Sequence, residues 1–298
     1  NYMITNNFNY LGYIMHSVRL SNPYDKNSDS WNLWNFYSNH YLPIIFLKLY
    51  SLKLLFNLEK EKVVFMSRDG YFLLHFYKAL FPSYNYDYVY ISRAAMKTAD
   101  REYIEYVKNK VNNAIVIDLV GSGKSFTFFC NKYEINYKSY ILYFMGRSNK
   151  YSIEYFPKNK MYAIFNYFNR YIERLNYATH GSFISFKNFK LITKKLEYDE
   201  KFYKPIYEIV NLSCEYINKL NDVLIEYNFE EKILYDMLFF YFGPPDFASK
   251  PKCESFSDQI LNILDKIEHE DSHVKNDTEE LDIKSNYFLD LNEYLTIY

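Results

Sequence analysis

The sequence predicts an α/β fold built on a parallel sheet, with additional flanking helices. Short apolar runs alternate with stretches of helical length, and polar turn signals follow the runs. Hydrophobic residues make up 49% of the chain and charged residues 24%, which suits a globular core. Because strand, turn, helix and strand follow one another in this order, the crossovers should be right-handed and the strands parallel.

The first half of the predicted sheet begins with "KVVFMS" (62–67), an apolar run that ends at the turn signal "RDG". The next stretch, "YFLLHFYKALF" (71–81), has helical length and closes before Pro82. A second strand is expected in "YDYVYIS" (86–92). It is followed by a single helix in "AAMKTADREYIEYVKN" (94–109).

The second half contains the most apolar strand, "NAIVIDLV" (113–120), after which "GSGKS" opens a helix that continues to residue 133. A fourth strand is expected in "KSYILYFM" (138–145). Beyond about residue 150 the strand pattern fades, and a polar loop is expected around His180.

These assignments divide the chain into three parts. Residues 1–60 are expected to form an N-terminal helical extension and residues 61–190 the α/β core. Residues 191–298 are expected to be mostly helical, with a mobile acidic loop near 268–281.

Composition narrows the classes of function. A net charge of -1 gives no reason to expect nucleic acid as a partner, and no apolar run is long enough for a transmembrane segment. Three scattered cysteines suggest a reducing compartment. Because the chain starts at Asn1 without a signal-type segment, it is expected to be cut from a longer polypeptide.

Tyrosine is unusually frequent, with 35 Tyr and 26 Phe bringing the aromatic fraction to 21%. The base composition of the gene is one explanation. A sugar-binding or interface surface is the other, since Tyr combines a flat apolar ring with a polar tip. Composition leaves both open.

The "GSGKS" turn first suggests an ATP-binding P-loop. That motif needs G-x-x-x-x-G-K-[ST], whose loop amides wrap a phosphate while the lysine reaches the β- and γ-phosphates. The first glycine would have to stand at position 118, where this sequence has Asp118. An acidic side chain there would repel the anion, so a P-loop is disfavoured.

The same stretch, "AIVIDLVGSGKS", resembles the site at which phosphoribosyltransferases bind phosphoribosyl pyrophosphate. The resemblance implies that Asp118 contacts the ribose hydroxyls. The turn would hold the 5-phosphate at a helix N-terminus through the residues Gly121, Ser122, Gly123, Lys124 and Ser125. Two departures exist: Ile117 replaces the first of two acidic residues, and Gly121 stands where purine-using members often have Asp. A nucleobase acceptor is therefore not expected.

The turns after the first and second expected strands carry further candidates. In "MSRDGYFL", Gly70 allows close backbone approach, and the planar fork of Arg68 matches pyrophosphate oxygens. Asp69 could hold Mg²⁺ or take the proton from an acceptor hydroxyl. In "YISRAAMK", the residues Ser92, Arg93 and Lys97 are expected to bind substrate, the two cations by neutralising the departing pyrophosphate.

The ordered set "VVFMSRDGYFL", "YVYISRAAM", "AIVIDLVGSGKS", "YIERLNYATHGS" and "DMLFFYFGPPDFASKPKCESFSDQI" resembles the phosphoribosyltransferase-like domain of bacterial polysaccharide ribofuranosyltransferases, as found in ribosyl-ribitol-phosphate capsule polymerases. This resemblance spans roughly residues 40–260. It implies a Rossmann-like phosphoribosyltransferase core and transfer of ribose 5-phosphate from phosphoribosyl pyrophosphate to a sugar or polyol hydroxyl. The product would be a β-ribofuranoside, and Mg²⁺ would assist the reaction.

The resemblance also implies partners and a location. A phosphatase module of haloacid-dehalogenase type would remove the 5-phosphate; this chain has no DxDx[TV] start, so that module is expected elsewhere in the same polypeptide or in a partner chain. A cytoplasmic location is expected. Association with the inner face of the membrane through a capsule-synthesis complex is an open alternative.

Three residues are candidates for catalysis. Asp69 is the first choice of base, slightly ahead of Glu173 and His180 in "ERLNYATHGS". His75, inside the expected helix 71–81, is interpreted as an ordinary helix residue. Two other functions stay open: a P-loop-like kinase or NTPase, and a non-catalytic interaction domain of a larger polymerase.

Overall fold

The computed structural model describes residues 9–121, 123–145, 161–163, 173–187, 190–193, 200–220, 259–260 and 262–264. Ser122 and the acidic segment near 268–281 lie outside the described residues. The chain divides into two compact units. The first comprises Asn1–Lys60, His75–Tyr84 and Tyr198–Ile267, and the second Glu61–Leu74, Asn85–Glu197 and Glu268–Tyr298.

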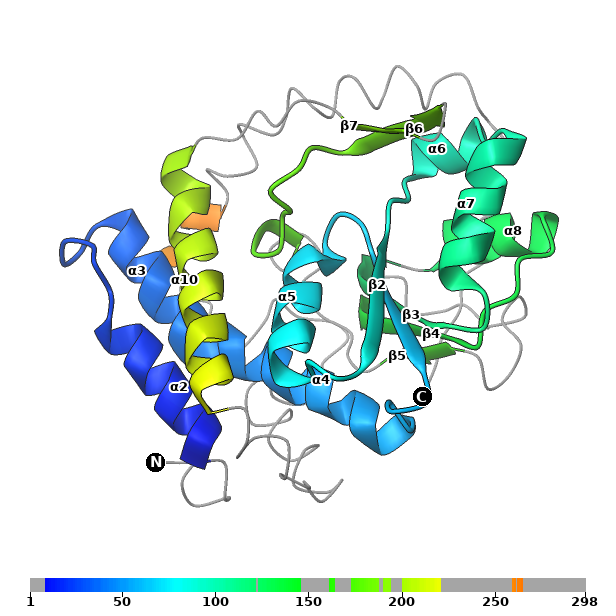
Figure 1. Cartoon of the computed structure of the whole chain (residues 1–298). Helices are drawn as coiled ribbons and strands as arrows, with labels where there is room; N and C mark the ends of the chain where they lie inside the picture. Colours follow the sequence, from blue (N-terminus) through cyan, green and yellow to red (C-terminus); the bar gives the residue numbers. More distant parts are fainter. Residues whose placement is uncertain are drawn as a thin grey trace. The chain divides into compact units, whose positions relative to one another are not determined.

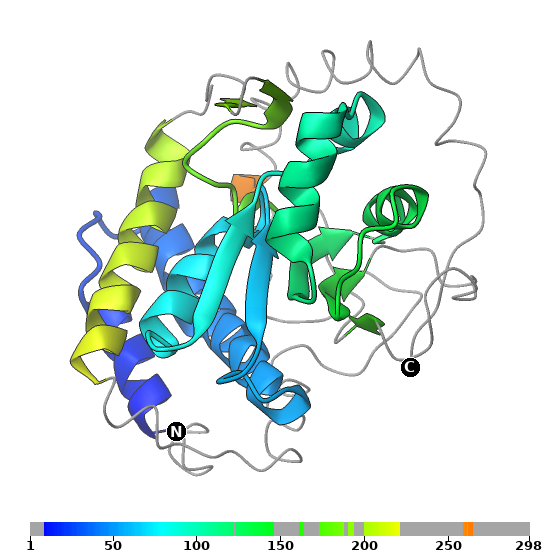
Figure 2. The ribbon, with the colours of Figure 1, turned by 45° about the vertical axis from the view of Figure 1, so that its right-hand side comes forward.

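Helices dominate the described part of the first unit. In chain order they are α2 (Asn9–Leu20), α3 (Asp29–Phe36), the π-helix η1 (Tyr37–Tyr41), α4 (Leu42–Leu55) and α10 (Glu200–Lys219). Helix α10 lies alongside α2 and α3 in both ribbon views (Figures 1 and 2). The hydroxyl of Tyr24 donates to Glu208 at 2.6 Å, and Nε1 of Trp34 donates to the Val18 carbonyl at 2.8 Å. These bonds tie α10 and α3 to their neighbours.

The second unit is built on a parallel sheet, which confirms the predicted α/β class. In the described residues its strands are β1 (Lys62–Met66), β2 (Asn85–Val89), β3 (Ile115–Gly121), β4 (Ser139–Met145) and β5 (Met161–Ala163). Their order is β2-β1-β3-β4-β5, and every neighbouring pair is parallel. The helices between the strands are α5 (Gly70–Leu80), α6 (Arg93–Lys97), α7 (Arg101–Val111) and α8 (Lys124–Lys132).

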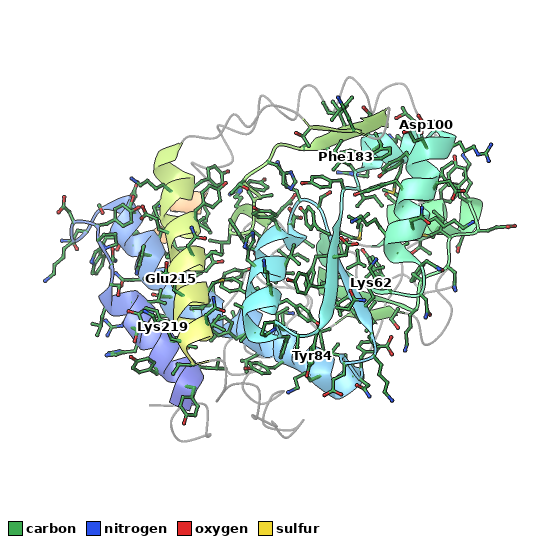
Figure 3. All side chains as sticks on the ribbon, in the orientation of Figure 1. Lys62, Tyr84, Asp100, Phe183, Glu215 and Lys219 are labelled. Atoms are coloured by element: carbon green, nitrogen blue, oxygen red, sulfur yellow. The ribbon has the colours of Figure 1, made fainter. Side chains whose placement is uncertain are left out.

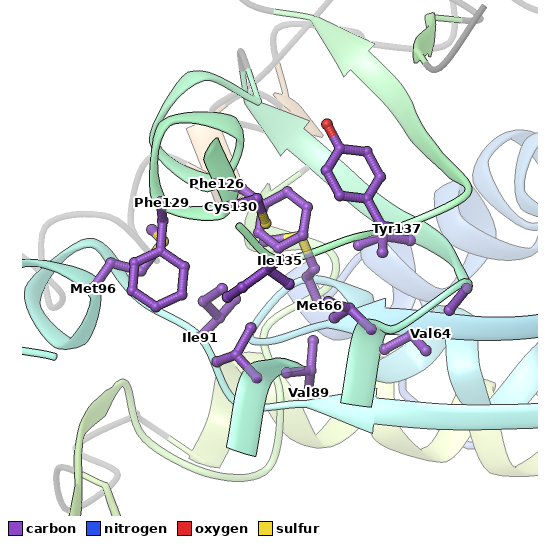
Figure 4. Close-up of a cluster of buried hydrophobic side chains, with 14 of the residues drawn as sticks. Val64, Met66, Val89, Ile91, Met96, Phe126, Phe129, Cys130, Ile135 and Tyr137 are labelled. Carbon is purple, nitrogen blue, oxygen red and sulfur yellow. The ribbon is translucent and has the colours of Figure 1, made fainter. Parts of the chain in front are cut away.

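One face of this sheet carries a continuous apolar core (Figure 4). Alternate strand residues such as Val64 and Val116 point into it, as the two-residue period of a strand requires. Helix α7 supplies Tyr103, Val107 and Val111, which lie four residues apart and so share one side of the helix. The core anchors the helices that start next to the strand ends.

The helix predicted over residues 94–109 is wrong in one respect, because the structure has two helices there. Helix α6 ends at Lys97 and α7 begins at Arg101. The carboxylate of Asp100, labelled in Figure 3, accepts a hydrogen bond from the Tyr103 amide at 2.8 Å and caps α7. A short polar side chain that caps a new helix favours a break over continuation.

The sequence also failed to predict the strands that follow β4. Residues around His180 lead into an antiparallel hairpin of β6 (Phe183–Lys187) and β7 (Lys190–Thr193), and β5 adds an edge to the sheet. β5 has only three residues, and β6 and β7, with five and four residues, mix apolar with charged side chains, so their alternation is weak. Phe183 packs into the core against Tyr103, with ring centroids 5.5 Å apart.

No helix in the described part of the chain combines the length and apolar character needed to cross a membrane.

Candidate functional site

The strand order creates a switch point between β1 and β3. From β1 the chain passes to β2 on one side, and from β2 it crosses to β3 on the other side of β1. In open parallel sheets, ligands bind beyond the carboxyl ends of the strands at such a point. The turn at residues 67–69 and the turn after Gly121 both lie at this edge.

The turn after β1 is held firmly by its first residue. The Ser67 hydroxyl donates to the Ile91 carbonyl and accepts from the Ile91 amide, both at 2.8 Å. The peptide bond between Ser67 and Arg68 is cis. At Gly70, a Cβ atom would lie 3.2 Å from Cβ of Phe65, so this position at the start of α5 favours glycine. The side chains of this turn therefore project from a fixed backbone.

Several contacts hold Arg68 in place. Its guanidinium carbon lies 3.9 Å from the ring centroid of Tyr177, a close cation–π stack. Its Nη1 donates to the Ser182 hydroxyl at 3.4 Å, and its carbonyl accepts from the Tyr71 amide at 3.2 Å. The segment that includes Tyr177 and Ser182 thus lies against the turn after β1.

The carboxyl groups of Asp69, Asp118 and Glu173 influence one another electrostatically. Burial raises the pKa of Asp69 well above its ordinary value, and the charges of Glu173 and Asp118 raise it further, against the opposing effect of Arg68. Burial also raises the pKa of Asp118 to about 6; Glu173 adds to this effect, while a hydrogen bond from the Tyr140 hydroxyl opposes it.

Acidic groups therefore outweigh the guanidinium in this cluster, and the structure unites residues that are far apart in the sequence. Repulsion between neighbouring carboxylates favours retention of a proton near neutral pH. Buried carboxyl groups with raised pKa values are suited to accept a proton from a substrate.

His180 joins the same region through tyrosine contacts. Its Nδ1 lies 2.9 Å from the Gly181 carbonyl, which can only accept, so Nδ1 carries the proton. Nε2 lies 3.0 Å from the Tyr88 hydroxyl and accepts from it when the ring is neutral. Burial lowers the pKa of His180, with Arg68 contributing and the Gly181 bond opposing. Because Nε2 already has a donor, this geometry favours a positioning role over a base.

Rings surround the histidine. Centroids of neighbouring rings lie 4.9 to 5.7 Å from that of His180, and they belong to Tyr71, Tyr88 and Tyr90.

The turn after β3 has a local geometry that favours glycine. Gly123 has φ 69°, in the left-handed region, and directly precedes helix α8, which begins at Lys124. Ser125 is half-buried in the first turn of that helix. Ser122 and the side chain of Lys124 lie outside the described residues.

This geometry argues against a P-loop. The residues that would wrap a nucleotide phosphate, from position 118 to Gly121, belong to strand β3. Only residues 122 and 123 separate the strand from α8. A two-residue connection cannot supply the long wrapping loop of the Walker motif. It does leave a helix N-terminus facing the sheet edge.

The turn after β2 carries Ser92, a predicted substrate-binding residue that also caps a helix. Its hydroxyl accepts from the Ala95 amide at 3.1 Å and so caps α6. Arg93, the first residue of α6, is exposed, and Lys97 at the end of this helix is half-buried. Among the contacts of the described residues, none links Arg93 to the cluster around Arg68.

Sequence reasoning missed the tyrosines of the site. Tyr88 and Tyr90 alternate along "YDYVYIS", which places them on one face near the carboxyl end of β2, and that period could have identified them. Tyr140 and Tyr177 gave no such signal, because their partners, Asp118 and Arg68, are distant in the sequence.

A separate hollow of about 820 Å³ runs along α7. Its lining residues are Asp87, Arg101, Glu102, Glu105, Tyr106, Asn109, Lys110 and Phe186. Asp87 forms ion pairs with Lys62 at 3.2 Å and Lys110 at 2.6 Å, which indicates a structural part for this carboxylate. None of the residues predicted from the sequence as a site lines the hollow.

Within the described residues, no group of three or more His, Cys, Asp or Glu side chains is arranged to hold a metal ion by itself. Mg²⁺ does not need such a group, because it binds through one or two carboxylates together with substrate phosphates and water. The oxygen donors of Asp69 fit that mode.

No protein-family model matches this sequence, and no curated protein matches it.

Proposed function

We propose that this chain is a glycosyltransferase that moves ribose 5-phosphate from phosphoribosyl pyrophosphate to a hydroxyl of a sugar or polyol. The observation that carries the proposal is the convergence of Arg68 with Asp69, Asp118 and Glu173 at the switch point of a parallel sheet. A cation for a phosphate and carboxyl groups with raised pKa values are what such a transfer requires.

The donor would lie across the turns after β1 and β3. The guanidinium of Arg68 would bind the pyrophosphate, since its fork matches phosphate oxygens. The backbone amides at the start of α8 would hold the 5-phosphate, because a helix N-terminus favours an anion. Asp118, three residues before the end of β3, would accept hydrogen bonds from the ribose hydroxyls. Arg93 and Lys97 remain proposed contacts of the departing pyrophosphate.

The reaction itself would be a substitution at the anomeric carbon. The bond between this carbon and the pyrophosphate oxygen breaks, and its electron pair leaves with the pyrophosphate. The acceptor oxygen forms the new bond from the opposite face, which gives a β-ribofuranoside. Asp69 would take the acceptor proton, and its raised pKa makes its carboxylate more basic than that of an ordinary aspartate. Glu173 would keep that pKa high, and His180 would orient Tyr88.

Because carboxyl groups outnumber cations in this cluster, the anionic donor would bind together with a divalent cation. An anionic pyrophosphate beside Asp69 and Glu173 would be repelled without one. Asp69 would hold Mg²⁺ indirectly, through water, jointly with the phosphates, and the bound ion would supply positive charge next to the leaving group.

Mass spectrometry of an acceptor panel incubated with phosphoribosyl pyrophosphate and Mg²⁺ tests the proposal. We expect one class of sugar or polyol acceptor to gain a ribose phosphate. Replacement of the base in Asp69→Asn should slow transfer by about 10²–10⁴-fold. Asp87→Asn, a matched change in the same sheet, should leave transfer nearly intact. Transfer at background with every acceptor would refute the proposal.

Calorimetry separates the alternatives. A kinase or NTPase would bind MgATP tightly and ignore phosphoribosyl pyrophosphate; the short turn after β3 predicts the reverse. A non-catalytic interaction domain would bind neither substrate.

The proposed cellular setting follows the sequence resemblance. The enzyme would act in bacterial capsule or polysaccharide synthesis on the cytoplasmic side of the membrane. A haloacid-dehalogenase-type phosphatase module would then remove the 5-phosphate from the product.

A further inference from the structure

Tyr177 has no direct part in the proposed reaction. Tyr177 is buried, with 8% of its surface exposed, and its ring lies against the guanidinium of Arg68. The separation of 3.9 Å between Cζ and the ring centroid is well inside the range of about 6 Å for cation–π contacts. The two residues come from the turn after β1 and from the segment that leads to β6.

A stacked guanidinium has a defined plane. Its N–H groups lie in that plane and point away from its edges, so an aromatic ring on its face orients the donors without competing for them. Nη1 donates to the Ser182 hydroxyl at 3.4 Å, which fixes rotation within the plane. The Arg68 carbonyl accepts from the Tyr71 amide at 3.2 Å, which holds the backbone of the same residue.

We propose that Tyr177 is a positioning residue, whose ring sets the plane in which Arg68 presents its N–H donors to a pyrophosphate group. The inference rests on the proposed function for the identity of that anion. The ligand class is a diphosphate, because a planar fork in a fixed orientation recognises paired phosphate oxygens bidentately.

The ring also reduces the cost of binding. An arginine side chain has many rotamers, and ordering one on binding weakens the affinity by roughly two- to tenfold. A guanidinium already held by Tyr177 loses less freedom when the anion arrives. Removal of the ring should therefore weaken anion binding by up to about tenfold.

Binding of inorganic pyrophosphate with Mg²⁺, measured by calorimetry on the full chain, tests the inference. We expect Tyr177→Leu to weaken binding about tenfold and Tyr177→Phe, which keeps the ring, to stay within about twofold. Tyr133→Leu is the matched control, since it removes another cation–π contact, with Lys132 at 5.0 Å. The inference would be overturned if Tyr177→Leu and Tyr133→Leu weakened pyrophosphate binding equally. It would also be overturned if Tyr177→Phe bound pyrophosphate as weakly as Tyr177→Leu.

A double-mutant cycle separates positioning from a general structural effect. In an Arg68→Ala background, Tyr177→Leu should have no further effect on pyrophosphate binding. A persistent tenfold loss would show that the ring acts otherwise. If Tyr177→Leu does not fold, Arg68→Lys replaces it: the charge remains but the planar fork is lost, so the same weakening is expected, and unchanged binding contradicts the inference.

Nuclear magnetic resonance gives a readout independent of any activity. Protons of Arg68 next to the guanidinium should show an upfield ring-current shift that Tyr177→Phe keeps and Tyr177→Leu abolishes. Pyrophosphate binding with these effects but without ribose transfer would refute the proposed function and leave the inference standing. An upfield shift in a chain that binds no pyrophosphate would refute the positioning role itself.

Discussion

Asp118 makes the protein less stable at neutral pH than a neutral side chain would, and the effect can be estimated. Its pKa is about 6 in the folded chain, against 3.8 ordinarily, mainly because of burial. A raised pKa means that the folded state binds the proton more tightly than the unfolded state does. Stability therefore falls as pH rises from about 4 to about 6 and stays low above that range.

The substitution Asp118→Asn imitates the protonated side chain and can still accept a hydrogen bond from Tyr140. A difference of about two pKa units, at 1.36 kcal/mol each, corresponds to about 3 kcal/mol. We therefore expect Asp118→Asn to raise the free energy of unfolding by up to about 3 kcal/mol at pH 7.5. At pH 4 the gain should be below about 1 kcal/mol.

The choice of probe matters for this measurement. Both tryptophans of the chain, Trp31 and Trp34, belong to the first unit, whereas Asp118 belongs to the second. Urea unfolding should therefore be followed by circular dichroism, including the near-ultraviolet tyrosine signal, across pH 4 to 7.5.

Asp87→Asn is a control that should change the free energy of unfolding in the opposite direction. Burial alone would raise the pKa of Asp87, but the hydrogen bonds and charge of Lys110 and the bond from Lys62 lower it overall. Its ionised form therefore stabilises the fold at neutral pH, and this contribution is lost as pH falls through the folded pKa. Asp87→Asn should destabilise at pH 7.5. An Asp118→Asn variant that is also less stable at pH 7.5, or whose difference from wild type is independent of pH, would refute the reasoning.

Three further predictions concern the same edge of the sheet. Tyr140→Phe removes a hydroxyl that lowers the pKa of Asp118, so the fall in stability should move to higher pH; an unchanged profile from urea unfolding would contradict this. Gly123→Ala forces a Cβ into the left-handed region and should cost about 1–2 kcal/mol in urea unfolding, with Gly123→Asn milder; equal effects would count against backbone strain as the cause. Tyr71→Ala exposes His180, so its pKa, measured by nuclear magnetic resonance, should rise toward the ordinary 6.5, while a further decrease would exclude burial as the main cause.

Local patterns were sufficient to predict most of the sheet from the sequence. Apolar runs bounded by turn residues predicted β1, β3 and β4 to within one or two residues. The break at Asp100 and the hairpin of β6 and β7 were not predicted. The first depends on a single capping bond, and the second on packing against α6 and α7 that short strands do not reveal.

In the candidate site too, features set by the local sequence were predicted, whereas contacts between residues distant in the sequence were not. The turns with Asp69 and Gly123 were visible as turns, because glycine and acidic residues after apolar runs mark strand ends. The approach of Glu173 to Asp69, and the stack of Tyr177 on Arg68, are tertiary contacts. No spacing along the chain predicts them.

The Ser67 hydroxyl has a consequence for how this edge of the sheet is built. It bonds to both the amide and the carbonyl of Ile91, so one side chain takes the place that the backbone of a further β1 residue would have had. The hydrogen bonding between β1 and β2 is thereby extended by one more pair of bonds, although the main chain has already turned away. Arg68 and Asp69 therefore lie in a turn whose backbone is held by hydrogen bonds like those of a strand.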